Sequence, residues 1–185
     1  DWSKYDAAII RATWDYYLCK DDFLYQLKNI EESGCKLFNS SQLVECNANK
    51  AYLFDMYEAG INVVPTIWMV DGSMSIQDAL IDFGCDEVIV KPAVSAGSYN
   101  TFRVLRENAP IYEHKAKKML AHSAVLIQPV VEEIIHRGEC SFIFFNNEFS
   151  HAVKKIPTSG DFRSQEKYGA NIQKYEPDAY MIERV

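Results

Sequence analysis

A lone lysine interrupts the segment VIVKPAVSAGSYNT at residues 88–101. The apolar run before it predicts a buried strand that ends at Lys91, and Pro92 restrains the backbone directly after it. The small residues of 95–98 follow, and such a loop lets backbone N–H groups approach an anion closely. One cation on a rigid strand, beside several backbone donors, is what a phosphate group requires. The alternative interpretation is a lysine that extends into solvent beside an ordinary turn.

A second polar residue ends an apolar run in LIQPVV, where Gln128 precedes Val130 and Val131. An adenine ring needs an apolar slot and hydrogen-bonding partners along its edge, and a side-chain amide followed by two valines can provide both. Further on, Glu139 follows Gly138 and begins a predicted strand, where its carboxylate can accept hydrogen bonds from both hydroxyls of a ribose. The alternatives are a polar strand end for Gln128 and a solvated strand-edge charge for Glu139.

Basic residues concentrate between positions 151 and 167, although the chain as a whole is acidic. Glycine turns at 160–163 and 169–170 indicate an irregular backbone that can place Arg163 on anionic oxygens. The alternative is a lysine-rich, solvated hairpin. The basic residues of this segment are His151, Lys154, Lys155, Arg163 and Lys167.

The composition restricts the class of protein. The chain has 185 residues with 19 Lys+Arg and 26 Asp+Glu, a formal net charge of −7, so we expect neither a nucleic-acid nor a membrane partner. Five cysteines without a C-x-x-C pair argue against a zinc site and indicate reduced thiols in a cytoplasmic protein. No apolar run approaches the ~20 residues that span a bilayer, and no signal peptide is visible. The chain begins at Asp1 without a methionine, so we expect it to be part of a longer protein.

Hydrophobic periodicity predicts the elements that position these residues. Strands and helices alternate to about residue 125 and strands then follow one another, which predicts an α/β part followed by an α+β part. Strands are expected at 7–10, 36–40, 62–71, 87–92 and 123–131, and a hairpin at 138–157 that turns at Asn146-Asn147. Helices are expected at 21–34, 40–60, 75–84, 108–121 and from 177 onward.

Taken together and in this order, the segments resemble the ATP-grasp superfamily. They are most similar to the glutathione-synthetase type of ATP-binding domain and to the O-ureido-serine cyclo-ligases of the cycloserine pathway. The resemblance covers most of the chain from residue 5 to about 177, and its motifs are RATWDYY, NKAYLFDMYEAGINVVPT, VIVKPAVSAGSYNTFR, LIQPVVEEI, GECSFIFFNNEFSHAVKKIP and GDFRSQEKYGANI.

The resemblance implies a partial ATP-grasp fold. Residues 1–45 correspond to the C-terminal part of a pre-ATP-grasp domain, 46–125 to the central subdomain and 126–185 to a second, truncated subdomain. It also implies that Lys50 and Lys91 are the two nucleotide-binding lysines, with Lys50 near the phosphates and Lys91 at the α-phosphate and the adenine side. The lid over the phosphates corresponds to Ser95, Ala96, Gly97 and Ser98.

The remaining roles implied by the resemblance lie in the last third of the chain. Glu139 is expected to hold the ribose, and Arg163 to reach the γ-phosphate and the acyl-phosphate intermediate. Lys155 and His151 are expected to line the same cavity, with Lys155 in a catalytic role. The adenine hinge corresponds to Gln128, Pro129, Val130 and Val131.

Two departures from the family pattern are visible. Gly169-Ala170 stands where relatives often have paired glycines. The acidic metal ligands of the family and an asparagine correspond to positions beyond residue 185, so no metal ligand is assigned here. Asp161 is the only acid expected near the triphosphate, and one carboxylate makes a poor metal site. We therefore expect the isolated 185-residue chain to be catalytically inactive.

In this family a carboxylate attacks the γ-phosphate of ATP to form an acyl phosphate, and an amine then displaces phosphate. The resemblance thus implies an ATP-dependent carboxylate–amine ligase that uses ATP, Mg²⁺, a small carboxylate and an amine-type co-substrate. The alternatives are a small-molecule kinase, a nucleotide-binding regulatory module without catalysis, and an α/β domain without a nucleotide. The identities of the acid and the amine cannot be read from these residues.

The motif RATWDYY remains open between two interpretations. Arg11 and Asp15 flank Trp14 directly after a strand. In relatives such a strand end faces the substrate cleft. The structural alternative is an inter-domain packing role for Trp14 with a local ion pair between Arg11 and Asp15.

Overall fold

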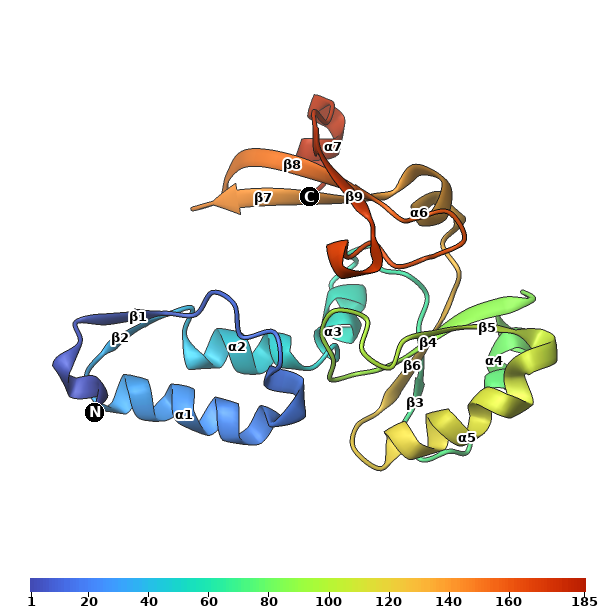
Figure 1. The fold of residues 1–185 in the computed structure, drawn as a ribbon, viewed down its shortest axis with the longest axis horizontal. Helices are drawn as coiled ribbons and strands as arrows, with labels where there is room; N and C mark the ends of the chain where they lie inside the picture. The colour runs from blue at the N-terminus through green and yellow to red at the C-terminus, as the bar shows by residue number, and fades with distance from the viewer. The chain divides into compact units, whose positions relative to one another are not determined.

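A computed structural model describes residues 1–185, which divide into two compact units at residues 1–129 and 130–185 (Figure 1). The first unit contains two hydrophobic cores, one within residues 24–37 and one within residues 69–127. The predicted three-part division at residues 45 and 125 is finer than this and stays a prediction. No helix has both the length and the apolar character needed to cross a bilayer, and all five cysteines are free thiols.

The N-terminal part of the first unit is a two-stranded parallel sheet with a helix between its strands. Leu24, Leu27 and Ile30 recur at helical spacing and are buried against Cys35 and Leu37, so their burial holds this helix on the sheet. The predicted elements are confirmed, and they are β1 (Ala7–Ile9), α1 (Lys20–Glu32) and β2 (Lys36–Phe38).

The central part of the first unit is a four-stranded sheet in the order β3-β6-β4-β5, with every neighbouring pair antiparallel. Ser75 caps the helix α4 with a capping box to Asp78, as its sequence position predicts. The sheet and its helices are β3 (Ile67–Met69), α4 (Ile76–Asp82), β4 (Glu87–Pro92), β5 (Phe102–Leu105), α5 (Ala109–Leu120) and β6 (Val125–Pro129).

Two expectations for this region are wrong in part. The strand expected over 62–71 is limited to Ile67–Met69, because Pro65 supplies no N–H group for a sheet ladder. The strand β5 was not expected, since its four residues are too few to show a period after the turn residues of the preceding loop.

The single helix expected over 40–60 is also wrong. Two helices occur instead, α2 (Ser41–Ala48) and α3 (Tyr52–Glu58), and Asn49 between them is extended. The backbone N–H of Lys50 donates to the carbonyl of Ala93, 3.0 Å away, rather than to the preceding helical turn. A hydrogen bond from a distant part of the chain thus ends the helix where the periodic pattern would continue it.

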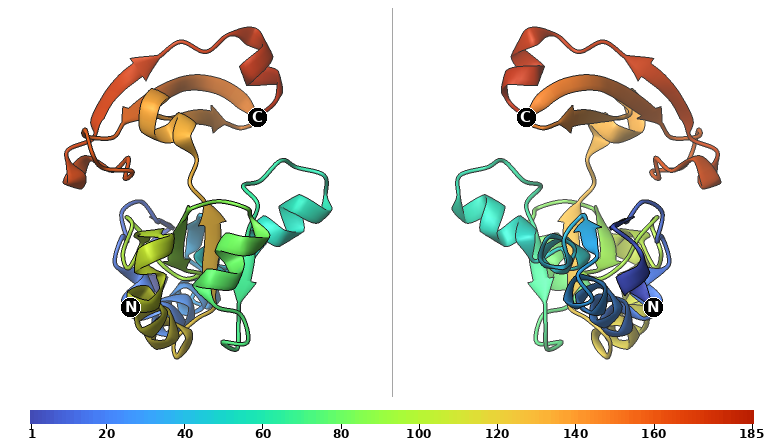
Figure 2. Two further views of the ribbon diagram at one scale, coloured as in Figure 1. Left: turned by 90° about the vertical axis from the view of Figure 1, so that its right-hand side faces the viewer. Right: turned by 90° about the vertical axis from the view of Figure 1, so that its left-hand side faces the viewer.

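The second unit is a three-stranded antiparallel sheet in the order β7-β8-β9. Figure 2 shows it as a curved layer with α7 at one end. Asn146 and Asn147 take positive φ values of 51° and 64° at the predicted hairpin turn. The elements are α6 (Glu132–Arg137), β7 (Glu139–Phe145), β8 (Glu148–Ile156), β9 (Asn171–Tyr175) and α7 (Ala179–Glu183). Four short 3₁₀ helices are Trp2–Lys4, Tyr16–Leu18, Arg106–Asn108 and Glu166–Tyr168.

The central core predicts a contrast between neighbouring residues of α4. Leu80 is 0% exposed within the core, whereas Ile81 is 61% exposed. Leu80→Ala is expected to lower the free energy of unfolding of the first unit by about 2–5 kcal/mol, because a cavity replaces buried contacts. Ile81→Ala is expected to cost about 0.5 kcal/mol or less. Urea unfolding measures both, and equal costs would contradict the described core.

Candidate functional site

Lys91 and Gln128 lie on the same face of the central sheet. Val88 and Val90 belong to the core, so the alternating residues Ile89 and Lys91 point to the opposite face of β4. The antiparallel register pairs Ile89 with Gln128 and Lys91 with Leu126. Paired residues of neighbouring strands share a face, so the lysine and the glutamine predicted to contact one ligand are diagonal neighbours on one surface.

Burial lowers the pKa of Lys91 below its ordinary value. Its ammonium group is therefore partly desolvated, which differs from the alternative of a lysine extending into solvent. Lys91 forms no ion pair with a carboxylate. A desolvated cation without a counter-ion is unfavourable by itself and is stabilised by a bound anion.

Lys50 lies in the break between α2 and α3 and reaches the loop after β4. Its ammonium group donates to the carbonyl oxygen of Ser95 at 3.0 Å, to the hydroxyl of Ser95 at 3.0 Å and to the carbonyl of Ala93 at 3.3 Å. Burial, and then the positive charge of Lys91, lower the pKa of Lys50 to about 8. The two predicted lysines therefore lie close enough for their charges to interact. Like Lys91, Lys50 forms no ion pair with a carboxylate.

The loop over 95–101 is fixed at both ends. Ser95 is buried and bonded to Lys50, and the ring of Tyr99 packs on Tyr17 with 4.6 Å between the ring centroids. Between these anchors the backbone turns sharply, and Gly97 and Ser98 have φ values of 56° and 58°. A positive φ is strained for a serine. The loop predicted to cover phosphates is therefore a defined structure tied to Lys50.

The amide of Gln128 has a fixed orientation. Thr66 donates its hydroxyl hydrogen to the carbonyl of Val64 at 2.7 Å, so its oxygen must accept the hydrogen bond of 2.7 Å from Nε2 of Gln128. The Oε1 atom of Gln128 consequently points away from Thr66. This carbonyl oxygen is an acceptor that the amino group of an adenine can use.

In the second unit Glu139 is paired with Lys155. The two residues face each other in the β7–β8 ladder, and the Lys155 Nζ lies 3.0 Å from Oε1 of Glu139, while Ser164 donates to Oε2. Burial raises the pKa of Glu139, but the hydrogen bonds from Ser164 and Lys155 outweigh it and hold the pKa below its ordinary value. Glu139 is therefore ionised and oriented rather than a solvated strand-edge charge.

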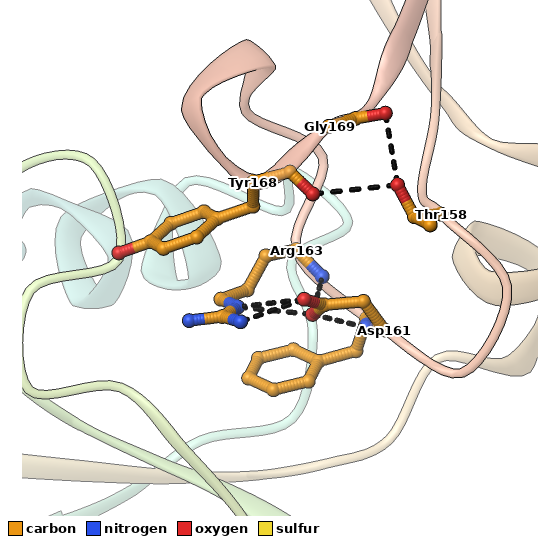
Figure 3. A network of polar contacts seen from close by, with 6 residues as sticks. Thr158, Asp161, Arg163, Tyr168 and Gly169 are labelled. Atoms are coloured by element: carbon orange, nitrogen blue, oxygen red, sulfur yellow. Dashed lines mark hydrogen bonds and ion pairs between the residues drawn. The ribbon is translucent and has the colours of Figure 1, made fainter.

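Arg163 is held by two neighbours (Figure 3). Asp161 accepts hydrogen bonds from Nε at 2.9 Å and from Nη2 at 2.6 Å, and the guanidinium stacks 3.7 Å above the ring of Tyr168. These bonds to Arg163 lower the pKa of Asp161. The hydroxyl of Thr158 closes the loop by donating to the carbonyl of Gly169 at 2.8 Å. Asp161, the acid expected to be nearest the triphosphate, thus orients Arg163.

The structure also locates the remaining predicted residues. His151 lies four residues from Lys155 on β8, is exposed, and contacts the hydroxyl of Ser150 at 3.0 Å. Pro129 ends the first unit and Val130 begins the second, so the predicted hinge is the connection between the units. The candidate residues form two groups, one in each unit.

Arg11 and Trp14 line a cavity of about 420 Å³ in the first unit together with Ala96 and Gly97. The local ion pair between Arg11 and Asp15 is absent. Asn39 and Asn47 line the same cavity and were not singled out from the sequence, because no motif links two asparagines to an arginine elsewhere in the chain.

The comparisons with known proteins bear on this arrangement. Residues 1–39 match the family described as the N-terminal domain of D-cycloserine synthetase DcsG. The cycloserine biosynthesis protein DcsG of Streptomyces lavendulae is 30% identical over 161 residues, which are 84% of this chain and 53% of that protein. The chain thus spans about half the length of this relative.

Solved structures agree with the sequence match. The crystal structure of D-cycloserine synthetase DcsG superimposes with a TM-score of 0.85 at 26% identity and covers 100% of this chain and 64% of that chain. The ATP-grasp ligase PsnB, complexed with a phosphomimetic variant of its minimal precursor, Mg and ADP, superimposes with a TM-score of 0.56 at 17% identity over 89% of this chain and 48% of that chain. The chain is a homologue of DcsG and has the ATP-grasp fold, and both predictions are confirmed.

Gly138 predicts a test of the backbone that positions Glu139. A Cβ atom at Gly138 would lie 2.8 Å from the carbonyl oxygen of Lys155, whereas one at Gly160 would meet nothing, although the φ values are +86° and +84°. Gly160→Ala is expected to cost about 1–2 kcal/mol for the left-handed backbone. Gly138→Ala is expected to cost about 1–3 kcal/mol more, because its ψ of 164° lies in a backbone region that is essentially restricted to glycine and because its Cβ atom would overlap the carbonyl oxygen. Urea unfolding followed by NMR resonances of the β7–β8 hairpin measures both, and equal costs would contradict this close approach.

The lowered pKa of Lys50 predicts a pH dependence of stability. In the unfolded chain Lys50 keeps its proton up to its ordinary pKa of 10.5, but in the folded chain it loses the proton near pH 8. Between these values the unfolded state binds more protons, so the free energy of unfolding rises with pH. Comparison with Lys50→Met isolates this contribution, because the other titrating groups are common to both proteins. From pH 8 to 10 the free energy of unfolding of wild type should rise relative to that of Lys50→Met. A difference that stays constant over this range would refute the lowered pKa of Lys50.

Proposed function

We propose that this homologue of DcsG carries the nucleotide-binding part of an ATP-dependent ligase that joins a carboxylate to an amine. The observation that carries the proposal is the pair Lys50 and Lys91, two partly desolvated cations without a carboxylate partner. Lys50 is bonded to Ser95 at the start of the strained loop over 95–98, and Lys91 shares a sheet with the oriented amide of Gln128. A nucleoside triphosphate complements this arrangement, because its phosphates match the two cations and its flat base matches the amide.

The triphosphate is assigned to the two lysines and to the loop over 95–98. An anion beside Lys50 and Lys91 removes their mutual repulsion and replaces the water that burial has excluded. Backbone N–H groups of a loop that turns through Gly97 add donors without further charge. In this proposal the loop also keeps water from the reacting phosphate.

The adenine is assigned to the hinge that begins at Gln128. The Oε1 atom of Gln128 accepts from the adenine amino group, while Val130 and Val131 provide apolar surface and backbone hydrogen-bonding groups. Guanine presents a carbonyl oxygen where adenine has its amino group, and two acceptors do not bond. The hinge thus favours ATP over GTP.

The second unit is assigned the ribose and the transferable phosphate. Glu139 retains acceptor capacity beyond the bonds from Lys155 and Ser164, because a carboxylate has about four lone-pair sites. In this proposal Lys155 orients Glu139 and Arg163 neutralises charge that develops on the γ-phosphoryl oxygens. Asp161 and Tyr168 hold the guanidinium in place, so little side-chain freedom is lost when it engages a phosphate.

Magnesium does not fit the residues of this chain alone. The structure contains no group of three or more His, Cys, Asp or Glu side chains that could hold a metal ion, and Asp161 is engaged by Arg163. When bound with a nucleotide, Mg²⁺ offsets the charge of the β- and γ-phosphates. No step of the proposed reaction is assigned to metal ligands of this chain.

The proposed reaction has two steps. An oxygen of the substrate carboxylate attacks the γ-phosphorus. The bond between the γ-phosphorus and the β-γ bridging oxygen breaks, and an acyl phosphate and ADP form. The amine then attacks the acyl carbon and inorganic phosphate leaves, which produces the amide. A kinase that phosphorylates a hydroxyl would release ADP without an amide. Product analysis of the natural full-length protein therefore separates the two reactions.

Replacement of Lys91 tests the phosphate assignment. Lys91→Met is expected to weaken ATP binding by about 1.5–3 kcal/mol, the scale of a hydrogen bond to a charged group. Lys118→Met is the matched control, because Lys118 is exposed on α5. Titration calorimetry on the 185-residue chain measures both. Unchanged affinity in a folded Lys91→Met protein would remove this lysine from the site.

Base selectivity tests the hinge. ATP is expected to bind the chain at least tenfold more tightly than GTP, and Gln128→Glu is expected to keep the adenine acceptor while adding a negative charge that weakens both nucleotides. Competition between ATP and GTP for a fluorescent nucleotide measures the ratio. Equal affinities for ATP and GTP in wild type would show that Gln128 does not read the base.

A further inference from the structure

We infer that Thr66 sets the base selectivity of the nucleotide site by holding the side-chain amide of Gln128 in one orientation. Thr66 acts on the base through Gln128 and is therefore a positioning residue. This role rests on the proposed adenine site at Gln128, but the orientation of the amide can be measured without a nucleotide.

Gln128 lies between Thr66 and Ile89 in the central sheet. The register of β3 and β6 pairs Ile67 with Ile127, so Thr66, one residue earlier, stands opposite Gln128. On the other side, β4 pairs Ile89 with Gln128. The side chain of an isoleucine has no polar atom, so of the two flanking side chains only Thr66 can orient the amide.

Val64, Thr66 and Gln128 form a directional chain of hydrogen bonds, the Thr66 relay. Nε2 of Gln128 donates to the hydroxyl oxygen of Thr66 at 2.7 Å, and this hydroxyl donates to the carbonyl of Val64 at 2.7 Å. A carbonyl has no hydrogen to donate, so the hydroxyl hydrogen of Thr66 must point toward Val64 and away from Gln128. In a flipped amide, Oε1 would face the lone pairs of the hydroxyl oxygen, and two acceptors repel each other. The relay therefore permits one orientation of the amide.

The backbone fixes the start of the relay. Val64 precedes Pro65, and a proline ring confines the residue before it to extended conformations. Thr66 is half-buried and β-branched, so its side chain has few accessible rotamers. The carbonyl and the hydroxyl are thus both restrained, and the orientation of the Gln128 amide originates in the proline-restrained segment before β3.

The open end of the relay is the Oε1 atom of Gln128. No protein group donates to this oxygen, whereas every fully buried side-chain nitrogen and oxygen atom has a hydrogen-bond partner. Oε1 is therefore accessible, although the residue as a whole is only 7% exposed. A fixed, accessible acceptor accepts from the exocyclic amino group of adenine and disfavours a base that has a carbonyl oxygen there.

Thr66→Val removes the relay and keeps the shape of the side chain. A methyl group replaces the hydroxyl, so neither orientation of the Gln128 amide finds a partner at position 66. The amide can then turn its NH₂ group toward the base, where it donates to a carbonyl oxygen. The site is expected to lose base selectivity while Lys50 and Lys91 still bind the triphosphate.

Competition between ATP and ITP on the 185-residue chain tests this role. ITP has the same ribose and triphosphate as ATP, but its hypoxanthine base has a carbonyl oxygen in place of the amino group. Wild type is expected to bind ATP at least tenfold more tightly than ITP. Thr66→Val is expected to lower this ratio at least threefold, and Thr66→Ser, which keeps a hydroxyl, is expected to retain it within twofold.

Ser33→Ala is the matched control. It also removes a hydroxyl that donates to a backbone carbonyl, that of Ile30 at 2.7 Å, but at the end of α1. The ratio of ATP to ITP affinity is expected to stay at the wild-type value in this variant. A ratio that falls as much in Ser33→Ala as in Thr66→Val would overturn the role of Thr66.

A double-mutant cycle separates positioning from a general structural effect. Gln128→Leu is expected to lower the ratio of ATP to ITP affinity by itself, because it removes the acceptor. Adding Thr66→Val to Gln128→Leu is expected to change the ratio no further. A general disturbance of the site would weaken ATP and ITP equally, and a ratio that falls again in the double variant would contradict action through Gln128.

NMR of the nucleotide-free chain measures the orientation itself. Nuclear Overhauser contacts from the side-chain NH₂ group of Gln128 to the Hβ atom of residue 66 are expected in wild type and in Thr66→Ser. In Thr66→Val these contacts are expected to fall to half their intensity or less, because both orientations of the amide are populated. Contacts of equal intensity in a folded Thr66→Val protein would refute the relay.

The binding data distinguish two failures. If Gln128→Leu lowers the ratio of ATP to ITP affinity and Thr66→Val leaves it unchanged, the adenine assignment stands and the role of Thr66 is refuted. If wild type binds ATP and ITP equally, or Gln128→Leu leaves the ratio unchanged, the adenine assignment itself fails, and the selectivity role of Thr66 fails with it.

Discussion

The hydrogen bonds of Lys50 to the loop after β4 are the constraint on which the rest of the first unit depends. The backbone N–H group of Lys50 bonds to Ala93, and its ammonium group bonds to Ser95. These bonds separate α2 from α3, bring Lys50 near Lys91 and fix the start of the loop that lines the Arg11 cavity. One residue thus joins a helix break, a pair of cations and a ligand-sized cavity.

Lys50 also places a second positive charge near Lys91, which is electrostatically unfavourable when no anion is bound. Two lysines with lowered pKa values lie near each other without a carboxylate, while Glu139 and Arg163 in the second unit each have an opposite charge in contact. The lysines therefore lack a counter-ion that a polyphosphate can supply, and the charges of the second unit are oriented in advance. A bound anion stabilises the charged forms of Lys50 and Lys91. It costs Glu139 and Arg163 little side-chain entropy, because their side chains are already oriented.

Much of this could be predicted from local patterns. The strand over 87–92 that carries Lys91, the capped α4 and the asparagine hairpin turn each depend on neighbours in sequence, and all are present. The break at Lys50 could not be predicted, because its cause is a hydrogen bond to residue 93. The pairing of Glu139 with Lys155 was missed for a related reason, since strand register sets it. The cavity joins segments far apart in the chain, and no spacing rule links them.

If Lys50 and Lys91 bind the phosphates of ATP, bound ATP must change the pKa of Lys50, and measuring this pKa is the most direct test. NMR titration of the Lys50 side chain in the 185-residue chain should give a midpoint at about 8 without nucleotide. Saturating ATP should raise this midpoint by at least one pH unit, because phosphate oxygens stabilise the charged ammonium group. A midpoint that does not move when ATP is bound would contradict the account.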